Sequence, residues 1–162
     1  VFEWFLGNKD LEPETIQTIE FVADYQPLSN LNFKLNLFHY DIEDLIELVP
    51  DPRQTTLTTQ NSRNHEGKGF ELEVQWLPIN SLLLKGNLAY QDSEDKDTGE
   101  TVPDAPQWQA YLNAHWNFLP DWSIDGQYFW IAGRERAAGD VREDIKDNNI
   151  VNLTLRRTNI LK

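Results

Sequence analysis

The stretch FELEVQWLPINSLLLKGNLAYQ, residues 70–91, alternates apolar and polar side chains on both sides of a short break. Successive side chains of a β-strand point to opposite faces, so every second residue shares a face. The apolar residues that share one face are Phe70, Leu72, Val74, Trp76, Leu82, Leu84, Leu88 and Tyr90. The break, Pro78–Ser81, contains the proline, asparagine and serine that favour turns. The stretch therefore predicts a β-hairpin with one continuous apolar face.

The same period of two recurs along most of the chain and predicts about seven strands. Their expected ranges are 15–25, 31–40, 56–77, 82–91, 107–118, 122–131 and 149–157. The one helix-like stretch, Ile42–Leu48, is short, and we interpret it as a strand extension or a single turn. The fold class predicted is all-β, an antiparallel up-and-down meander.

The expected connections between strands differ in length in a regular way. Short turns are expected at 26–30, 78–81 and 119–121, and long charged loops at 41–55, 92–106 and 133–148. Strands in up-and-down order turn at alternate ends of the sheet, so the short turns gather at one end and the long loops at the other. This asymmetry is typical of outer-membrane β-barrels.

Composition narrows the class of protein. The chain has 162 residues, enough for one domain, and a net charge of −13, which argues against a nucleic-acid partner. It has no cysteine, so it forms neither a disulfide nor a thiolate metal site. No apolar stretch approaches the roughly 18 residues of a spanning helix, whereas a membrane barrel, whose strands alternate, stays compatible with this composition.

Two interpretations explain the apolar face. In a soluble β-sandwich it packs on a second sheet, and in a membrane barrel it contacts lipid. Aromatic residues favour the barrel, because Trp76 and Trp122 lie beside short turns while Tyr90 and Trp130 lie toward the opposite strand ends. The eight residues from Trp122 to Trp130 cover roughly 26 Å of strand, or roughly 20 Å of depth at a tilt of about 40°. The predicted strands of ten residues or more are also long for a sandwich.

Several segments resemble TonB-dependent outer-membrane receptors. Residues 7–27, GNKDLEPETIQTIEFVADYQP, resemble the segment that in those receptors reads Gly-Asn-x-x-Leu-x-Pro-Glu before a long strand. The matching residues are Gly7, Asn8, Leu11, Pro13 and Glu14. Residues 35–46, 67–76, 89–112 and 136–142 are similar to later barrel segments of the family, in the same order.

The resemblance implies a barrel of 22 strands filled by an N-terminal plug, which imports ferric siderophores, cobalamin, haem or oligosaccharides with energy delivered through TonB. The sequence shows no plug, no TonB box and, at Leu161–Lys162, no terminal aromatic strand. We therefore expect residues 1–162 to be a single segment of the C-terminal part of the barrel in a bacterial outer membrane.

The resemblance also implies the partners of this segment. They are a small-molecule nutrient such as a ferric siderophore, outer-membrane lipid, and the remainder of the barrel and plug. TonB is expected to act only through the missing N-terminal region. Seven strands leave two unpaired edges, so the isolated segment is expected to self-associate.

Arg134, Arg136 and Arg142 are the candidate site residues, because they lie on the third long loop. In the receptors such loops contact ligand, and arginine can bind an anionic siderophore through two parallel hydrogen bonds. The alternative is that these arginines only balance the acids Asp140, Glu143 and Asp144.

Catalytic, metal and cofactor sites are not expected. No two of His39, His65 and His115 are spaced as local metal ligands, and the acidic loop 92–100 does not match a calcium-binding loop. The chain has no Gly-x-Ser-x-Gly motif, and Glu71 and Glu73 are more simply lumen-lining residues than a catalytic pair. A soluble β-sandwich that binds carbohydrate stays open as the alternative function.

Overall fold

The computed structural model describes residues 4–52 and 55–160. Within these residues the regular structure is entirely β, which confirms the predicted class, and no helix is long and apolar enough to cross a membrane. The strands are β1 (Trp4–Leu6), β2 (Thr15–Leu28), β3 (Leu31–Pro50), β4 (Thr56–Ile79), β5 (Leu82–Asp95), β6 (Pro106–Leu119), β7 (Trp122–Arg134) and β8 (Asn148–Arg157). The expected absence of an aromatic last strand concerns Leu161 and Lys162, which lie outside the described residues.

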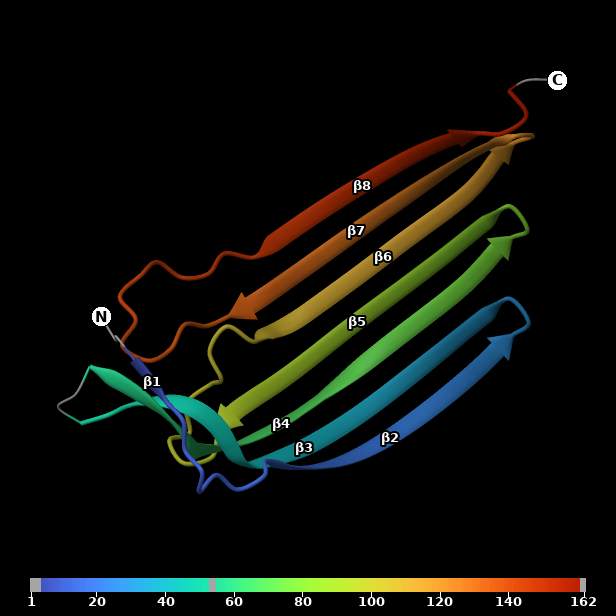
Figure 1. The fold of residues 1–162 in the computed structure, drawn as a ribbon. Helices are drawn as coiled ribbons and strands as arrows, with labels where there is room; N and C mark the ends of the chain where they lie inside the picture. The colour runs from blue at the N-terminus through green and yellow to red at the C-terminus, as the bar shows by residue number, and fades with distance from the viewer. Residues whose placement is uncertain (1–3, 53–54, 161–162) are drawn as a thin grey trace.

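Seven long strands, β2 to β8, lie side by side in chain order, each antiparallel to the next (Figure 1). This is the predicted meander. The eighth strand, β1, was not expected, and it pairs in parallel with the start of β4, from Trp4 opposite Thr56 to Leu6 opposite Thr58. The outer edges of β2 and β8 have no neighbouring strand among the described residues.

The short-turn end of the sheet follows one repeated design. Each hairpin closes with a two-residue turn and has a register shift just before it, at Tyr25/Leu28, Trp76/Ile79 and Trp116/Leu119. A carbonyl of each turn accepts a hydrogen bond from a backbone N–H near the end of the second strand after that turn, which is β4, β6 or β8. The pairs are Leu77 N to Asn30 O, Asn117 N to Ser81 O and Thr158 N to Asp121 O, each at 2.8 Å. These bonds connect successive hairpins and fix their stagger.

The long-loop end differs most from the prediction between β3 and β4. Residues 41–55 were expected to be a loop, but β3 continues to Pro50 and β4 begins at Thr56. The alternation breaks at Asp44, which has a positive φ of 59° and lies in a register shift of β3 against β4. A β-bulge of this kind moves later side chains to the other face, so the strand continues although its period does not. The interpretation of Ile42–Leu48 as a strand extension is confirmed.

The sheet is a single layer without an interior. Ala132 is the one buried apolar residue in the described part of the chain. Large apolar side chains are instead exposed on every strand of the meander except β5, among them Phe21 at 62%, Leu112 at 54% and Leu153 at 72%. A water-soluble domain buries most side chains of this kind, so these exposed apolar residues require a partner that covers them.

Candidate functional site

Residues directly opposite each other in the ladders share a face, and the register therefore decides which side chains form each surface. One row runs Tyr25, Phe33, Val74, Gly86, Leu112, Tyr128 and Val151 across all seven strands of the meander. The next row runs Ala23, Leu35, Leu72, Leu88, Ala110, Trp130 and Asn149. We call this surface the apolar face. The predicted facing of the hairpin at residues 70–91 is confirmed.

Aromatic rings mark two levels of the apolar face. Beyond the rows above, toward the long-loop end, Phe70, Tyr90 and Trp108 form a cluster with ring centroids 4.6–6.2 Å apart. Toward the short-turn end, the Phe118 ring lies between Trp116 and Trp122, at 5.7 and 6.4 Å. Rings at two levels with aliphatic residues between them are the arrangement that two water–lipid interfaces favour.

The opposite surface, which we call the polar face, carries hydrogen-bonding and charged groups. Asn113 donates a hydrogen bond to Asp125 Oδ2 at 3.0 Å, and His115 Nδ1 lies 3.5 Å from the same oxygen. The groove beside them has a volume of about 340 Å³ and is lined in part by Arg156. This surface suits water or a polar plug.

Two glycines on the polar face make room for aromatic rings. Gly67 and Gly69 of β4 lie opposite Tyr40 and Phe38 of β3, and a Cβ built on either glycine would overlap the facing ring. The Tyr40 hydroxyl reaches across Gly67 to Ser93 Oγ of β5 at 2.8 Å. The GKG sequence thus lets one tyrosine span three strands near the long-loop end.

Asp95 fixes the start of the loop between β5 and β6. Its side chain is almost fully buried, and Oδ1 accepts hydrogen bonds from the backbone N–H groups of Asp97 and Thr98 at 2.9 and 3.1 Å. Burial alone would raise the pKa of Asp95, but these N–H donors and the nearby Arg63 outweigh it, and the pKa is lowered. The carboxylate therefore stays charged and holds the loop.

The two long loops meet at this end of the sheet. Asp104 N donates to Glu135 O at 2.8 Å, which joins the loop after β5 to the loop after β7. A cavity of about 170 Å³ lies between the loops and the end of β4, with Arg63, His65 and Asp95 among its lining residues. Charged groups therefore line the cavity between the two loops.

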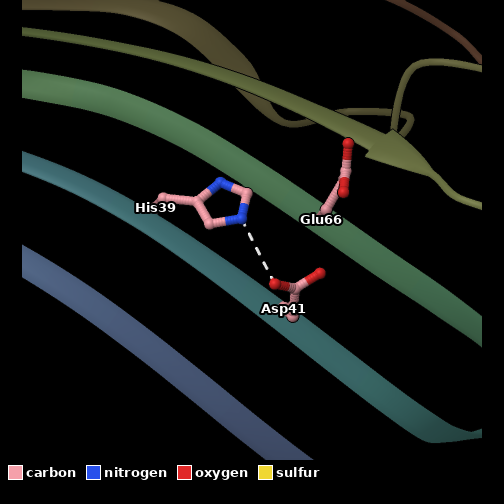
Figure 2. A group of neighbouring side chains, drawn as sticks. All are labelled: His39, Asp41 and Glu66. Carbon is pink, nitrogen blue, oxygen red and sulfur yellow. Dashed lines mark hydrogen bonds and ion pairs between the residues drawn. The ribbon is translucent and has the colours of Figure 1, made fainter.

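A second cluster lies on the same side of the sheet as the apolar face, just beyond the aromatic rings. His39 and Asp41 of β3 and Glu66 of β4 place three ligand atoms within 4.8 Å of one another (Figure 2). Lys96 Nζ lies 2.9 Å from Asp41 Oδ1, and His39 Nε2 lies 3.2 Å from Asp41 Oδ2. The Lys96 hydrogen bond lowers the pKa of Asp41, and the same bond raises the pKa of Lys96.

Comparison with known proteins decides between membrane barrel and sandwich. A family model described as the TonB dependent receptor-like β-barrel matches residues 2–159. This chain belongs to that family. Members of the family are bacterial outer-membrane proteins, and the matched structures named below are receptors or transporters rather than enzymes. The sandwich alternative is not supported.

Solved structures show the same fold at low identity. A mutant of the ferric enterobactin receptor PfeA from Pseudomonas aeruginosa, in complex with enterobactin, matches 92% of this chain with a TM-score of 0.77 and 20% identity. The ferric-catecholate import receptor Fiu from K12 E. coli, in its closed form, matches 94% with a TM-score of 0.72 and 19% identity. The FrpB iron transporter from Neisseria meningitidis matches 96% with a TM-score of 0.73 and 15% identity.

The chain spans about a quarter of the receptors that it matches. The share covered is 24% of the PfeA chain, 22% of the Fiu chain and 26% of the FrpB chain. No curated protein matches this sequence. These solved receptors therefore show the fold of the segment, the family model shows its family, and the ligand stays a proposal.

The three predicted ligand-contacting arginines all lie on or beside the loop after β7, and each contacts the loop itself. Arg142 pairs with Asp140 through Nε at 2.9 Å and through Nη2, while Arg136 Nη1 lies 3.9 Å from the same carboxylate. The Arg142 hydrogen bonds are the main reason that the pKa of Asp140 lies far below its ordinary value. Arg134 Nη2 donates to Lys146 O at 3.2 Å. Contact with a ligand stays a prediction.

Sequence reasoning missed the cluster of His39, Asp41 and Glu66. It compared the histidines only with one another, and the two carboxylates come close to His39 through strand pairing. Asp41 lies directly opposite Glu66, a relation that appears only when β3 and β4 are aligned. The other two histidines lie on the polar face, where His65 is opposite Asp95 and His115 is opposite Asp125.

Proposed function

We propose that this chain forms part of the wall and of the extracellular loops of a TonB-dependent receptor in a bacterial outer membrane. The whole receptor would import a scarce nutrient such as a ferric siderophore, cobalamin or an oligosaccharide. Residues 1–162 are one barrel segment, and the plug, the contact with TonB and the remaining strands belong to other parts of the receptor.

The observation that carries this proposal is the apolar face. It extends over all seven strands of the meander, and every described strand belongs to one sheet, so no second layer of the described chain covers it. Lipid is the partner that matches a face bounded by aromatic rings at two levels. The opposite face, with its charged and amide side chains, then lines the interior.

The free edges of β2 and β8 support the same proposal. Each edge exposes a row of unpaired N–H and C=O groups, which the neighbouring strands of a complete barrel would pair. The isolated segment lacks these neighbours, and we expect it to associate with copies of itself.

The nutrient would enter at the long-loop end. We propose that Arg134, Arg136 and Arg142 face an anionic ligand there, with Arg136 and Arg142 exchanging Asp140 for the ligand's oxygens. The named ligand of PfeA is enterobactin, and FyuA from Yersinia pestis is named as a ferric yersiniabactin uptake receptor, so ferric siderophores are the first class to test.

Cell fractionation and uptake test the proposal together. The receptor containing this segment should sediment with the outer membrane, and iron-starved cells should need it to grow on one member of a siderophore panel. Arg142→Gln should weaken uptake of an anionic siderophore, whereas Arg157→Gln, at the short-turn end beside Trp122, should not. Recovery in the soluble periplasm would contradict the proposal. Normal uptake by Arg134, Arg136 and Arg142 variants would remove these arginines from the ligand site.

A further inference from the structure

We propose that His39, Asp41 and Glu66 form a divalent-metal site on the outer side of the barrel wall, for an ion of the Zn²⁺ class. The site lies between the aromatic cluster and the long-loop end, on the surface opposite the lumen. It is separate from the cavity between the long loops and does not depend on which nutrient the receptor imports.

The pairing of β3 with β4 holds the three side chains in place. Asp41 and Glu66 are direct partners in the ladder, and His39 projects from the same face of β3 one row away. Directly opposite side chains have Cβ atoms about 4.5–5.5 Å apart, and the long ladder fixes their backbone. Metal binding therefore has to order only side chains that already converge (Figure 2).

The distances suit a small ion. Ligand atoms about 2.0–2.2 Å from a tetrahedral ion lie roughly 3.4 Å from one another. His39 Nε2 and Asp41 Oδ2 are already 3.2 Å apart, and the whole set lies within 4.8 Å. Small rotations of Glu66 would close the site, and the open positions would hold water.

The chemical types of the three ligand atoms indicate which ion would bind. One imidazole nitrogen and two carboxylate oxygens suit Zn²⁺ and its neighbours among the first-row metals, whereas Mg²⁺ and Ca²⁺ prefer oxygen ligands alone. His39 is therefore the residue that gives the site its selectivity, and a calcium titration serves as an internal comparison.

The negative charge around the cluster also favours binding of a cation. Residues 41–51 contain five carboxylates and no Lys or Arg, and residues 92–105 contain six carboxylates and one lysine. That lysine, Lys96, contacts Asp41, but the Glu66 carboxylate has no hydrogen bond or ion pair among the residues that the structure describes. A second lysine, Lys68, lies opposite His39 with its Nζ 3.9 Å from Asp92 Oδ2, and the two lysines together balance only part of this negative charge. The remaining field concentrates mobile cations at this point.

Lys96 supplies a direct test, because its ammonium group contacts Asp41 Oδ1 and its positive charge would repel an ion held between Asp41 Oδ2 and His39. Replacing it removes a competing positive charge and should tighten metal binding, by about tenfold for a unit charge about 4 Å away in water with some salt screening. Removing an ordinary surface lysine should not have this effect. Lys146 is the matched control, because it is exposed on the other long loop at the same end of the sheet.

The experiment is a titration of Zn²⁺ into the purified receptor in detergent micelles after removal of bound metal. We expect one ion whose binding is weakened at least tenfold in His39→Gln and unchanged in His115→Gln. Lys96→Met should bind about tenfold more tightly than the unaltered receptor, while Lys146→Met stays within twofold. Equal titrations of His39→Gln and the unaltered receptor would overturn the proposal, as would equal affinities of Lys96→Met and Lys146→Met.

Discussion

Replacing Leu112 by arginine places a charge on the apolar face at its mid-depth. Leu112 is 54% exposed and lies on β6, four residues from Trp108 and four from Trp116. At about 3.3 Å per residue and a tilt of about 40°, each ring is roughly 10 Å away in depth. An arginine at the middle of a barrel's lipid face costs about 2–4 kcal/mol, and we expect Leu112→Arg to lower the free energy of unfolding by that amount.

The measurement is urea unfolding of the receptor in lipid vesicles, followed by tryptophan fluorescence. The control is Asn87→Arg, since Asn87 lies on β5 on the polar face, opposite Tyr111. An arginine there faces the interior and should cost under about 1 kcal/mol. Equal losses in the two variants would show that the faces are assigned incorrectly.

Two further changes test the packing and the loop. Gly67→Ala should destabilise the receptor by about 1–3 kcal/mol because its methyl group overlaps the Tyr40 ring, and the further change Tyr40→Ala should reduce that loss in the same urea assay; a loss that Tyr40→Ala leaves unchanged would contradict the packing. The pKa of Asp140 is lowered in the folded loop, so its contribution to loop order is complete above its ordinary value of 3.8 and declines as the pH falls below it. A nitroxide label at the exposed Val141 should therefore be more mobile in Asp140→Asn than in the unaltered receptor at pH 7, and equal mobility would contradict the role given to Asp140.

The short-turn end of the sheet was predictable because local chemistry decides it. Alternation placed the start of β3, β5 and β7 at the observed residues Leu31, Leu82 and Trp122. Proline, asparagine, serine and aspartate supply the turns between the strands, and each turn involves only neighbours in sequence. The facing of each strand followed from the same period of two.

The long-loop end was predicted less well, because its structure depends on contacts between distant residues. The bulge at Asp44 interrupts the alternation, and the continuation of β3 to Pro50 became visible only through its pairing with β4. The parallel pairing of β1 with β4 joins Trp4–Leu6 to residues more than fifty positions away. Neither stretch has a sequence pattern that predicts pairing with the other.

The candidate sites also divide into features visible in the local sequence and features that depend on contacts between distant residues. A loop rich in arginine is visible in sequence, but the sequence does not show that Arg136 and Arg142 both contact Asp140. The cluster of His39, Asp41 and Glu66 needs the β3–β4 register before its members become neighbours.

The most direct test of the account is spin-label accessibility along β6. The segment contains no cysteine, so single cysteines can be placed from residue 109 to residue 115 without removing any native one. In receptor reconstituted into vesicles, labels at 110, 112 and 114 should collide with oxygen dissolved in the bilayer. Labels at 109, 111, 113 and 115 should not collide with that oxygen, because they face the interior. Labels at 110, 112 and 114 that are shielded from oxygen, or that collide instead with a water-soluble nickel complex, would contradict a lipid-facing surface.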